Sequence, residues 1–229
     1  MIKLIMFDLD DTLVDHKAGA EAALNAVINL MIKTSHIPDS YDSKPFVDAY
    51  SKKNHRLWEN FTAGRIAIDK LLEERFNYIA DWFETDENIK EEIKKCYWDT
   101  YTTNCPLTAD WIPLLEELKN HFSLVICSNG AHEVQIRKLK ANNIVKFFDG
   151  LYFGTEQPKC KPFEDFFRGI LDDFKLKPEE VLMVGDSLEN DIIPCSKMGM
   201  QVLVYKSDSS YEKLKGCMMD KTGARNVTI

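Results

Sequence analysis

The chain of 229 residues is long enough for one large domain, or for a domain with a sizeable insertion. Its formal net charge of -8 disfavours nucleic acid polymers and anionic membranes as main partners, because either would require a basic face. Its six cysteines form no CxxC pair, which favours reduced thiols over a disulfide framework.

The first predicted element is a strand. Residues Ile2 to Leu9 form a short apolar run that ends in acidic residues, the pattern of a strand buried on both faces in a parallel sheet. This run is too short for a signal peptide or a membrane span, so we expect a cytoplasmic protein.

Residues 15–105 contain helical patterns and no convincing strand. Pro38 and Pro45 bound the first break between them, and Thr85-Asp86 is a typical helix start. The patterns cover Ala18–Lys33, Lys44–Phe61, Ile66–Phe83 and Asp86–Tyr101. We predict an all-helical domain inserted after the first strand.

From Thr108 onward, helical and apolar extended patterns alternate. The predicted helices are Ile112–Asn120, Glu133–Asn142, Glu164–Phe174 and Asn190–Met198. The predicted strands are Phe122–Cys127, Gly150–Phe153, Val181–Val184 and Gln201–Tyr205. This alternation indicates an α/β fold in which a parallel sheet carries helices on both faces. The polar tail after Ser207 shows no clear element, and we assign it none.

Acidic residues follow the first strand in the segment FDLDDTL. Asp8 and Asp10 are two residues apart, so their side chains start on the same side of the sheet. They lie at the carboxyl end of the strand, where open α/β sheets bind ligands. One carboxylate can attack a phosphorus atom while the other handles the proton of the leaving group. Alternatively, these acids only end the strand and cap the following turn.

The segment GDSLEND follows the predicted strand Val181–Val184. Gly185 lets the backbone turn closely, and Asp186 and Asp191 add two carboxylates at the end of this strand. Four carboxylates at one edge of a sheet would repel each other unless a cation joined them, and oxygen-rich sites suit Mg²⁺. Taken alone, the segment is also typical of a turn with an N-capping acid.

Two further segments suit an anion. In CSNG, Ser128 and Asn129 offer a hydroxyl and an amide just before a helix, although this is also an ordinary turn sequence. In CKP, Pro162 holds Lys161 extended and starts the next helix. This lysine can balance the charge of Asp8 and a bound phosphate, whereas most lysines are solvated surface groups.

In this order, the four segments resemble the motifs of the haloacid dehalogenase superfamily. FDLDDTL matches the first motif (DxDxT), CSNG the second, CKP the third and GDSLEND the fourth. The match covers roughly residues 1–16 and 106–206. The resemblance implies a Rossmann-like catalytic core, residues 1–14 and 106–229, and a helical cap domain, residues 15–105.

The resemblance also implies catalytic roles. Asp8 would be the nucleophile and Asp10 the general acid and base, while Ser128 and Lys161 would hold the phosphoryl group. Dehalogenases of this superfamily lack an aspartate at the position of Asp10, because a departing halide needs no proton. The presence of Asp10 therefore favours phosphoryl transfer.

A Mg²⁺ site follows from the same resemblance. Its ligands would be Asp8, the main-chain carbonyl of Asp10, Asp186 and Asp191, the last closing the site. We also expect Thr12 and Asn129 to bind the substrate.

The predicted cap contains a segment that resembles the cap of bacterial 5′-nucleotidases acting on pyrimidine nucleotides. It comprises LWENFTAGRI (Leu57–Ile66), followed by Arg75-Phe76. Trp58 can stack on a base, and Arg65 can meet a phosphate or sugar oxygen. Alternatively, Trp58 belongs to the apolar core of the cap.

We therefore expect an enzyme that hydrolyses a small phosphorylated metabolite, a nucleoside monophosphate in the first instance, and a monomer or weak homodimer. The motifs equally fit a phosphatase for phosphoglycolate, a sugar phosphate or N-acylneuraminate 9-phosphate. The large cap disfavours a phosphomutase. A non-catalytic binding protein is disfavoured because Asp8, Asp10, Lys161 and Asp186 are all retained.

Overall fold

The computed structural model describes residues 1–157, 159–206, 215–216 and 226–228. Two compact units make up the chain: an α/β unit, Met1–His16 with Pro106–Ile229, and a helical unit, Lys17–Cys105. Among the described helices, none combines the length and the apolar character that a membrane crossing requires. No disulfide joins the five cysteines that the structure describes. Most of the tail after Ser207 lies outside the described residues.

The α/β unit contains a parallel sheet with the strand order β3-β2-β1-β4-β5-β6. The strands are β1 (Leu4–Phe7), β2 (Ser123–Ser128), β3 (Gly150–Phe153), β4 (Val181–Gly185), β5 (Gln201–Val204) and β6 (Asn226–Thr228). The five predicted strands are confirmed, because their bounds differ from the prediction by no more than two residues. β6 falls in the tail for which we predicted no element.

The order of the strands determines where a ligand can bind. From β1 the chain runs outward through β2 to β3, and then returns with β4 to the other side of β1. Open α/β sheets form their binding crevice at the carboxyl ends of strands where the direction of winding reverses. Asp8 and Asp186 follow the two strands, β1 and β4, that meet at this point.

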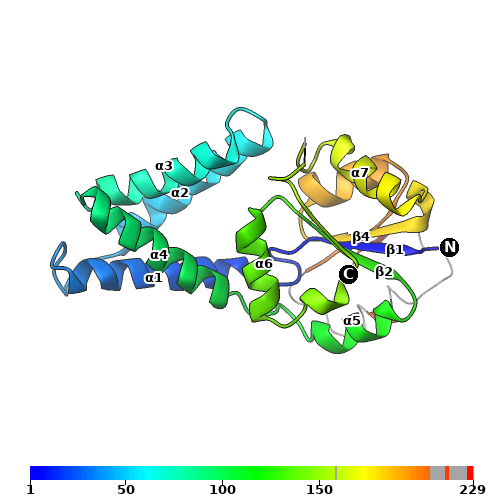
Figure 1. Cartoon of the computed structure of the whole chain (residues 1–229), viewed down its shortest axis with the longest axis horizontal. Helices are drawn as coiled ribbons and strands as arrows, with labels where there is room; N and C mark the ends of the chain where they lie inside the picture. Colours follow the sequence, from blue (N-terminus) through cyan, green and yellow to red (C-terminus); the bar gives the residue numbers. More distant parts are fainter. Residues whose placement is uncertain (158, 207–214, 217–225, 229) are drawn as a thin grey trace. The chain divides into compact units, whose positions relative to one another are not determined.

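Helices cover both faces of the sheet, with α5 and α7 on opposite sides of it (Figure 1). Met6 packs in one apolar cluster with Phe167 of α7. Phe7, the next residue along β1, points to the other face and contacts Trp111 of α5, with ring centroids 5.9 Å apart. The α-helices of this unit are α5 (Trp111–Lys119), α6 (His132–Ala141), α7 (Glu164–Phe174) and α8 (Ile193–Lys197). Short 3₁₀ turns occupy Val145–Phe147 and Pro178–Glu180.

The predicted range of α7, Glu164–Phe174, is confirmed, whereas the predicted start at Pro162 and the predicted helix Asn190–Met198 are wrong. The segment predicted as one helix, Asn190–Met198, is a π-helical turn (η3, Leu188–Ile192) followed by α8. Ser187 caps the π turn by accepting a hydrogen bond from the Asn190 N–H, and Pro194 stands in the first turn of α8, where a missing donor costs little. α7 starts at Glu164 rather than at Pro162, which is joined to Lys161 by a cis peptide bond.

The helical unit contains no strand among its residues, all of which are described. Its helices are α1 (His16–Lys33), α2 (Lys44–Thr62), α3 (Ile68–Trp82) and α4 (Glu87–Thr103). The predicted start at Asp86 is confirmed, because its carboxylate accepts the Ile89 N–H at 3.0 Å as an N-cap. Aromatic side chains, including Phe46, Phe76 and Tyr97, fill the interior.

The chain leaves and re-enters the α/β unit at neighbouring points. Val14 forms an antiparallel bridge with Leu107. On either side of it, the Thr108 N–H donates to the Leu13 carbonyl at 3.0 Å and the Asp15 N–H donates to the Pro106 carbonyl at 2.8 Å. These bonds satisfy backbone groups at the junction and hold the two passing segments together.

Candidate active site

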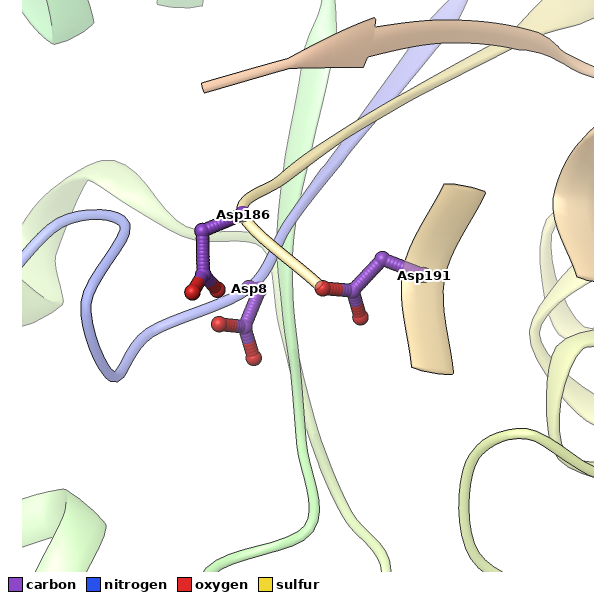
Figure 2. Close-up of side chains that lie close together, drawn as sticks. All are labelled: Asp8, Asp186 and Asp191. Carbon is purple, nitrogen blue, oxygen red and sulfur yellow. The ribbon is translucent and has the colours of Figure 1, made fainter. Parts of the chain in front are cut away.

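Three carboxylates converge at the carboxyl ends of β1 and β4. Asp8 directly follows β1, Asp186 follows β4, and Asp191 lies in the π turn η3. One oxygen from each lies within 4.8 Å of the others, and Figure 2 shows Asp186 and Asp191 on either side of Asp8. Asp8 and Asp191 are buried, whereas Asp186 is exposed.

Gly185 makes room for one of these acids. A Cβ atom at this position would lie 2.4 Å from Asp191 Oδ2, too close for any other residue type to be accommodated without a shift. The Ser187 N–H donates to the same oxygen at 3.2 Å. The sequence Gly-Asp-Ser therefore lets Asp191 fold back against the end of β4.

Lys161 joins the cluster from the loop before α7. Its Nζ lies 2.7 Å from Asp8 Oδ1 and 2.6 Å from Asp191 Oδ1, and only 3% of its side chain is exposed. Burial raises the pKa of Asp8 to about 7, with Lys161 opposing the shift and Asp191 adding to it. Burial followed by the charge of Asp8 raises the pKa of Asp186 to about 6.

These observations fit a divalent cation. When all three acids are ionised, Lys161 neutralises one of their charges, and two remain. Burial is the largest cause of the raised pKa of each of these carboxyl groups, and the opposing charge of Lys161 does not cancel it. The donor atoms are all oxygens, which Mg²⁺ prefers.

Thr12 links the ends of the two strands. It is fully buried, and its hydroxyl donates to Asp8 Oδ2 at 3.3 Å and lies 3.4 Å from Asp186 Oδ1. The same hydroxyl oxygen accepts the Asp186 N–H at 3.0 Å. Its contacts therefore position the two acids, and a contact between Thr12 and substrate stays a prediction.

Asn129 links the second and third motifs. Its side-chain NH₂ donates to the Lys161 carbonyl and its side-chain oxygen accepts the Lys161 N–H, both at 2.8 Å. This pair of bonds fixes the main chain from which the Lys161 side chain reaches the acids. Substrate binding by Asn129 likewise stays a prediction.

The Asp10 carboxylate contacts two residues that the sequence reasoning missed. Lys138 Nζ lies 2.6 Å from Asp10 Oδ1, and Gln135 Nε2 lies 2.8 Å from Asp10 Oδ2. Burial alone would raise the pKa of Asp10, but Lys138, His16 and the hydrogen bonds hold it below its usual value. Gln135 Nε2 also donates to Ser128 Oγ at 2.7 Å. The only sequence signal for Gln135 and Lys138 was their spacing of three residues, which places them on one face of a helix.

Comparison with known proteins places the chain in a family. Residues 5–205 match the family model described as haloacid dehalogenase-like hydrolase. The chain belongs to this family. The match spans the four motifs and the helical unit between the first and the second.

Relatives within the haloacid dehalogenase-like family carry different substrate names. The chain is 29% identical over 206 residues to glyceraldehyde 3-phosphate phosphatase of Pyrococcus furiosus. This alignment covers 90% of this chain and 81% of the relative. The chain is 24% identical to N-acylneuraminate-9-phosphatase of Rattus norvegicus (91% and 84%) and to pyrimidine 5′-nucleotidase PynA of Streptococcus pneumoniae (89% and 83%).

Among solved structures, the putative hydrolase YfnB of Bacillus subtilis, described as bound to magnesium, has the same fold. The TM-score is 0.75 at 22% identity, and the superposition covers 95% of this chain and 98% of YfnB. At this identity the likeness establishes the fold and not the substrate. The haloacid dehalogenase-like fold with a helical insertion is thereby confirmed.

The two substrate-binding candidates of the helical unit lie near the end of α2. Trp58 is half-buried and packs edge-on against Phe61, with ring centroids 5.6 Å apart. The Arg65 guanidinium donates to Asn60 Oδ1 at 2.7 Å and to the Glu59 carbonyl at 3.5 Å. These contacts stabilise the end of the helix, and the role of either residue in substrate binding stays a prediction.

Proposed function

We propose that this protein is a Mg²⁺-dependent phosphomonoesterase that works through an aspartyl-phosphate on Asp8. The observation that carries the proposal is the buried nucleophile position of Asp8, held by Lys161 beside two further acids at the switch point of the sheet. The proposed Mg²⁺ ligands are Asp8, the Asp10 main-chain carbonyl, Asp186 and Asp191. A bound Mg²⁺ would neutralise charge on the phosphoryl oxygens.

In the first step, a carboxylate oxygen of Asp8 attacks phosphorus. The bond between phosphorus and the ester oxygen breaks, and that oxygen takes a proton from Asp10, which yields the free alcohol. Lys161 and Ser128 hold the phosphoryl oxygens during the transfer. The negative charge of the bound monoester favours prior protonation of Asp10, because like charges raise the pKa of a carboxyl group.

In the second step, water attacks the phosphorus of the aspartyl-phosphate. Asp10, now ionised, accepts a proton from this water, the bond between phosphorus and Asp8 breaks, and inorganic phosphate leaves. The low pKa of Asp10 in the free protein favours the ionised form that this step requires. Asp8 is regenerated as a carboxylate.

For the substrate, we propose a nucleoside monophosphate with a pyrimidine base. The support is the segment Leu57–Ile66 with its exposed arginine and half-buried tryptophan, together with the similarity to PynA. Arg75-Phe76, the second part of this resemblance, is buried inside the helical unit and supports its packing. The similarity to phosphatases of N-acylneuraminate 9-phosphate and glyceraldehyde 3-phosphate favours a small sugar or triose phosphate as the alternative.

The test is phosphate release with Mg²⁺ from a panel of nucleoside monophosphates, sugar phosphates, glyceraldehyde 3-phosphate and phosphoglycolate. Asp8→Asn is the blank, because it retains the shape of the side chain but removes the nucleophile. Preference for pyrimidine monophosphates that is lost in Asp8→Asn would support the whole proposal. Preference for another ester would retain the mechanism and overturn the nucleotidase assignment. Equal release by Asp8→Asn would overturn the mechanism.

A further inference from the structure

Gln135 and Lys138 of α6 are fully buried although both are strongly polar. They stand three residues apart and therefore share one face of the helix. Burial of such groups costs free energy unless hydrogen bonds compensate it. Their partners are side chains of the proposed active site, Asp10 and Ser128.

The amide of Gln135 has a single favourable orientation. Its Nε2 donates to Asp10 Oδ2 at 2.8 Å and to Ser128 Oγ at 2.7 Å, which uses both of its hydrogens. Its Oε1 is buried and has no hydrogen-bond partner among the described residues. An unpaired buried carbonyl costs about 1–3 kcal/mol. The reversed amide would place Oε1 against a carboxylate oxygen, so Asp10 determines the orientation.

This contact fixes the hydrogen-bonding role of Ser128. Its Oγ accepts from Gln135 Nε2 and, at 3.3 Å, from the Gly130 N–H. A hydroxyl has two acceptor positions and one hydrogen, so Ser128 is left with its hydrogen to donate. Gly130 permits the arrangement, because a Cβ there would lie 2.2 Å from Gln135 Nε2. A donating hydroxyl is what a phosphoryl oxygen requires.

Lys138 completes the hold on Asp10. Its Nζ lies 2.6 Å from Asp10 Oδ1, so each carboxylate oxygen receives a donor from α6. The Asp10 side chain is nevertheless 29% exposed. The side chain is therefore held by α6 and still keeps part of its surface accessible.

We propose that Gln135 and Lys138 are positioning residues for phosphoryl transfer: Gln135 sets Ser128 as a hydrogen-bond donor to the phosphoryl group, and both hold Asp10 in place to protonate the leaving oxygen. This inference rests on the proposed function. In the step concerned, the bond from Asp8 to phosphorus forms, the ester bond breaks, and the departing oxygen takes the proton of Asp10.

The leaving group provides the test for Lys138. An alkoxide needs a proton to depart, whereas p-nitrophenolate departs without one. We expect Lys138→Met to lower kcat/KM about 100-fold for the best alkyl phosphate of the panel, and less than about fivefold for p-nitrophenyl phosphate. kcat/KM is the appropriate measure because it covers the steps through formation of the aspartyl-phosphate and excludes its hydrolysis.

Controls separate positioning from a structural role. Lys140→Met, at an exposed lysine of the same helix, should leave both values of kcat/KM unchanged. Equal losses for the two esters in Lys138→Met, or no loss for either, would overturn the proposed role of Lys138. Should Lys138→Met not fold, Lys138→Gln retains a hydrogen-bond donor without the charge and allows the same comparison.

Gln135→Leu tests the effect on Ser128. We expect kcat/KM to fall about tenfold or more for both esters, and the inhibition constant of inorganic phosphate to rise by a similar factor. An unchanged inhibition constant would show that Gln135 does not act through phosphate binding. Gly130→Ala, which displaces the Gln135 amide, should reproduce the result if Gln135→Leu does not fold. The proposed function fails separately, when the unaltered protein releases no phosphate from any ester.

Discussion

Lys161 of the α/β unit and Arg75 of the helical unit are both buried cations, but they are held by opposite kinds of partner. Lys161 lies 2.7 Å from Asp8 and 2.6 Å from Asp191. Asp186 completes a group in which acids outnumber the lysine. The protein therefore concentrates negative charge at this point and leaves part of it uncompensated.

Arg75 is surrounded by neutral groups. Its guanidinium donates to the hydroxyls of Tyr50 and Tyr97 at 2.7–3.1 Å, and its Cζ lies 5.1 Å from the ring centroids of Tyr97 and Trp98. In the described part of the chain, no carboxylate forms an ion pair with it. Burial raises the pKa of Tyr97 well above its usual value, so this hydroxyl stays neutral.

Lys161 and Arg75 therefore differ in whether their surroundings leave charge unpaired. The arginine is satisfied by hydroxyls and aromatic faces, so its site is complete without a ligand. The acids beside Lys161 carry more charge than it offsets, and we propose that a bound cation completes them; perturbed electrostatics of this kind are typical of functional sites. The stability of the α/β unit should therefore respond to ions, and that of the helical unit to packing.

The largest effect should come from breaking the ion pairs of the α/β unit. Lys161→Met leaves Asp8 and Asp191 buried without their cation, which should lower the free energy of unfolding by about 3–5 kcal/mol. Phosphate release should fall roughly 100- to 1,000-fold, because the variant lacks the group that we propose holds the phosphoryl oxygens. Denaturant unfolding and phosphate release measure the two effects. Activity within tenfold of the unaltered protein would contradict the proposed role of Lys161.

Addition of Mg²⁺ should stabilise the two units to different extents. Mg²⁺ at about 100 times its dissociation constant should stabilise the α/β unit by about 2.7 kcal/mol relative to protein in a chelator. The rate of amide hydrogen exchange in the helical unit should not change. The stabilisation should shrink from about pH 8 to about pH 6, because Asp8, with its pKa of about 7, then binds protons in competition with the cation. Hydrogen exchange resolves the two units.

A matched pair of variants controls the Mg²⁺ experiment. Asp186→Asn removes one of the three clustered acids and should reduce the stabilisation. Asp165→Asn removes an exposed acid of α7 and should not. If both variants respond to Mg²⁺ like the unaltered protein, the cation binds elsewhere.

A smaller effect is expected in the helical unit. Arg75→Met leaves the Tyr50 and Tyr97 hydroxyls without their donor, and should lower local stability by about 1–3 kcal/mol, independently of Mg²⁺. Faster hydrogen exchange in α2 and α3 is the readout. Arg56→Met, at an exposed position of α2, should change exchange little. A Mg²⁺-dependent effect of Arg75→Met would contradict the proposed difference between Lys161 and Arg75.

The smallest effect concerns substrate choice. Trp58→Ala should lower kcat/KM for pyrimidine monophosphates up to about tenfold, the value of one lost stacking contact, with p-nitrophenyl phosphate as the reference ester. If both esters lose equally, Trp58 supports the helical unit through Phe61 and does not read the base.

Most of the fold could be predicted because burial leaves a continuous apolar signature. The four residues of β1, Leu4–Phe7, are all buried, and strands covered on both faces read as apolar runs. Residues 190–198 were predicted as a single helix because their apolar spacing is helical throughout. The cap at Ser187 and the proline at position 194 act on the backbone, and they divide the segment without changing that spacing.

The candidate acids could be predicted because they follow strands whose ends must meet. Gln135 and Lys138 could not be predicted, since polar residues on an amphipathic helix usually face solvent. Only tertiary packing shows that they share the buried face of α6 with Leu139. Asp10, the partner that they share, lies 125 and 128 residues away in sequence, so no local pattern reveals these contacts.

The bridge between Val14 and Leu107 closes the α/β unit at the point where residues 17–105 are inserted. Because the entry and exit segments are hydrogen-bonded neighbours, the register of β1 does not depend on what the chain does between them. Loop-closure entropy grows only slowly with length, so an exchanged or lengthened insertion adds little cost to the sheet. Residues 17–105 can therefore change in evolution without displacing Asp8 at the end of β1.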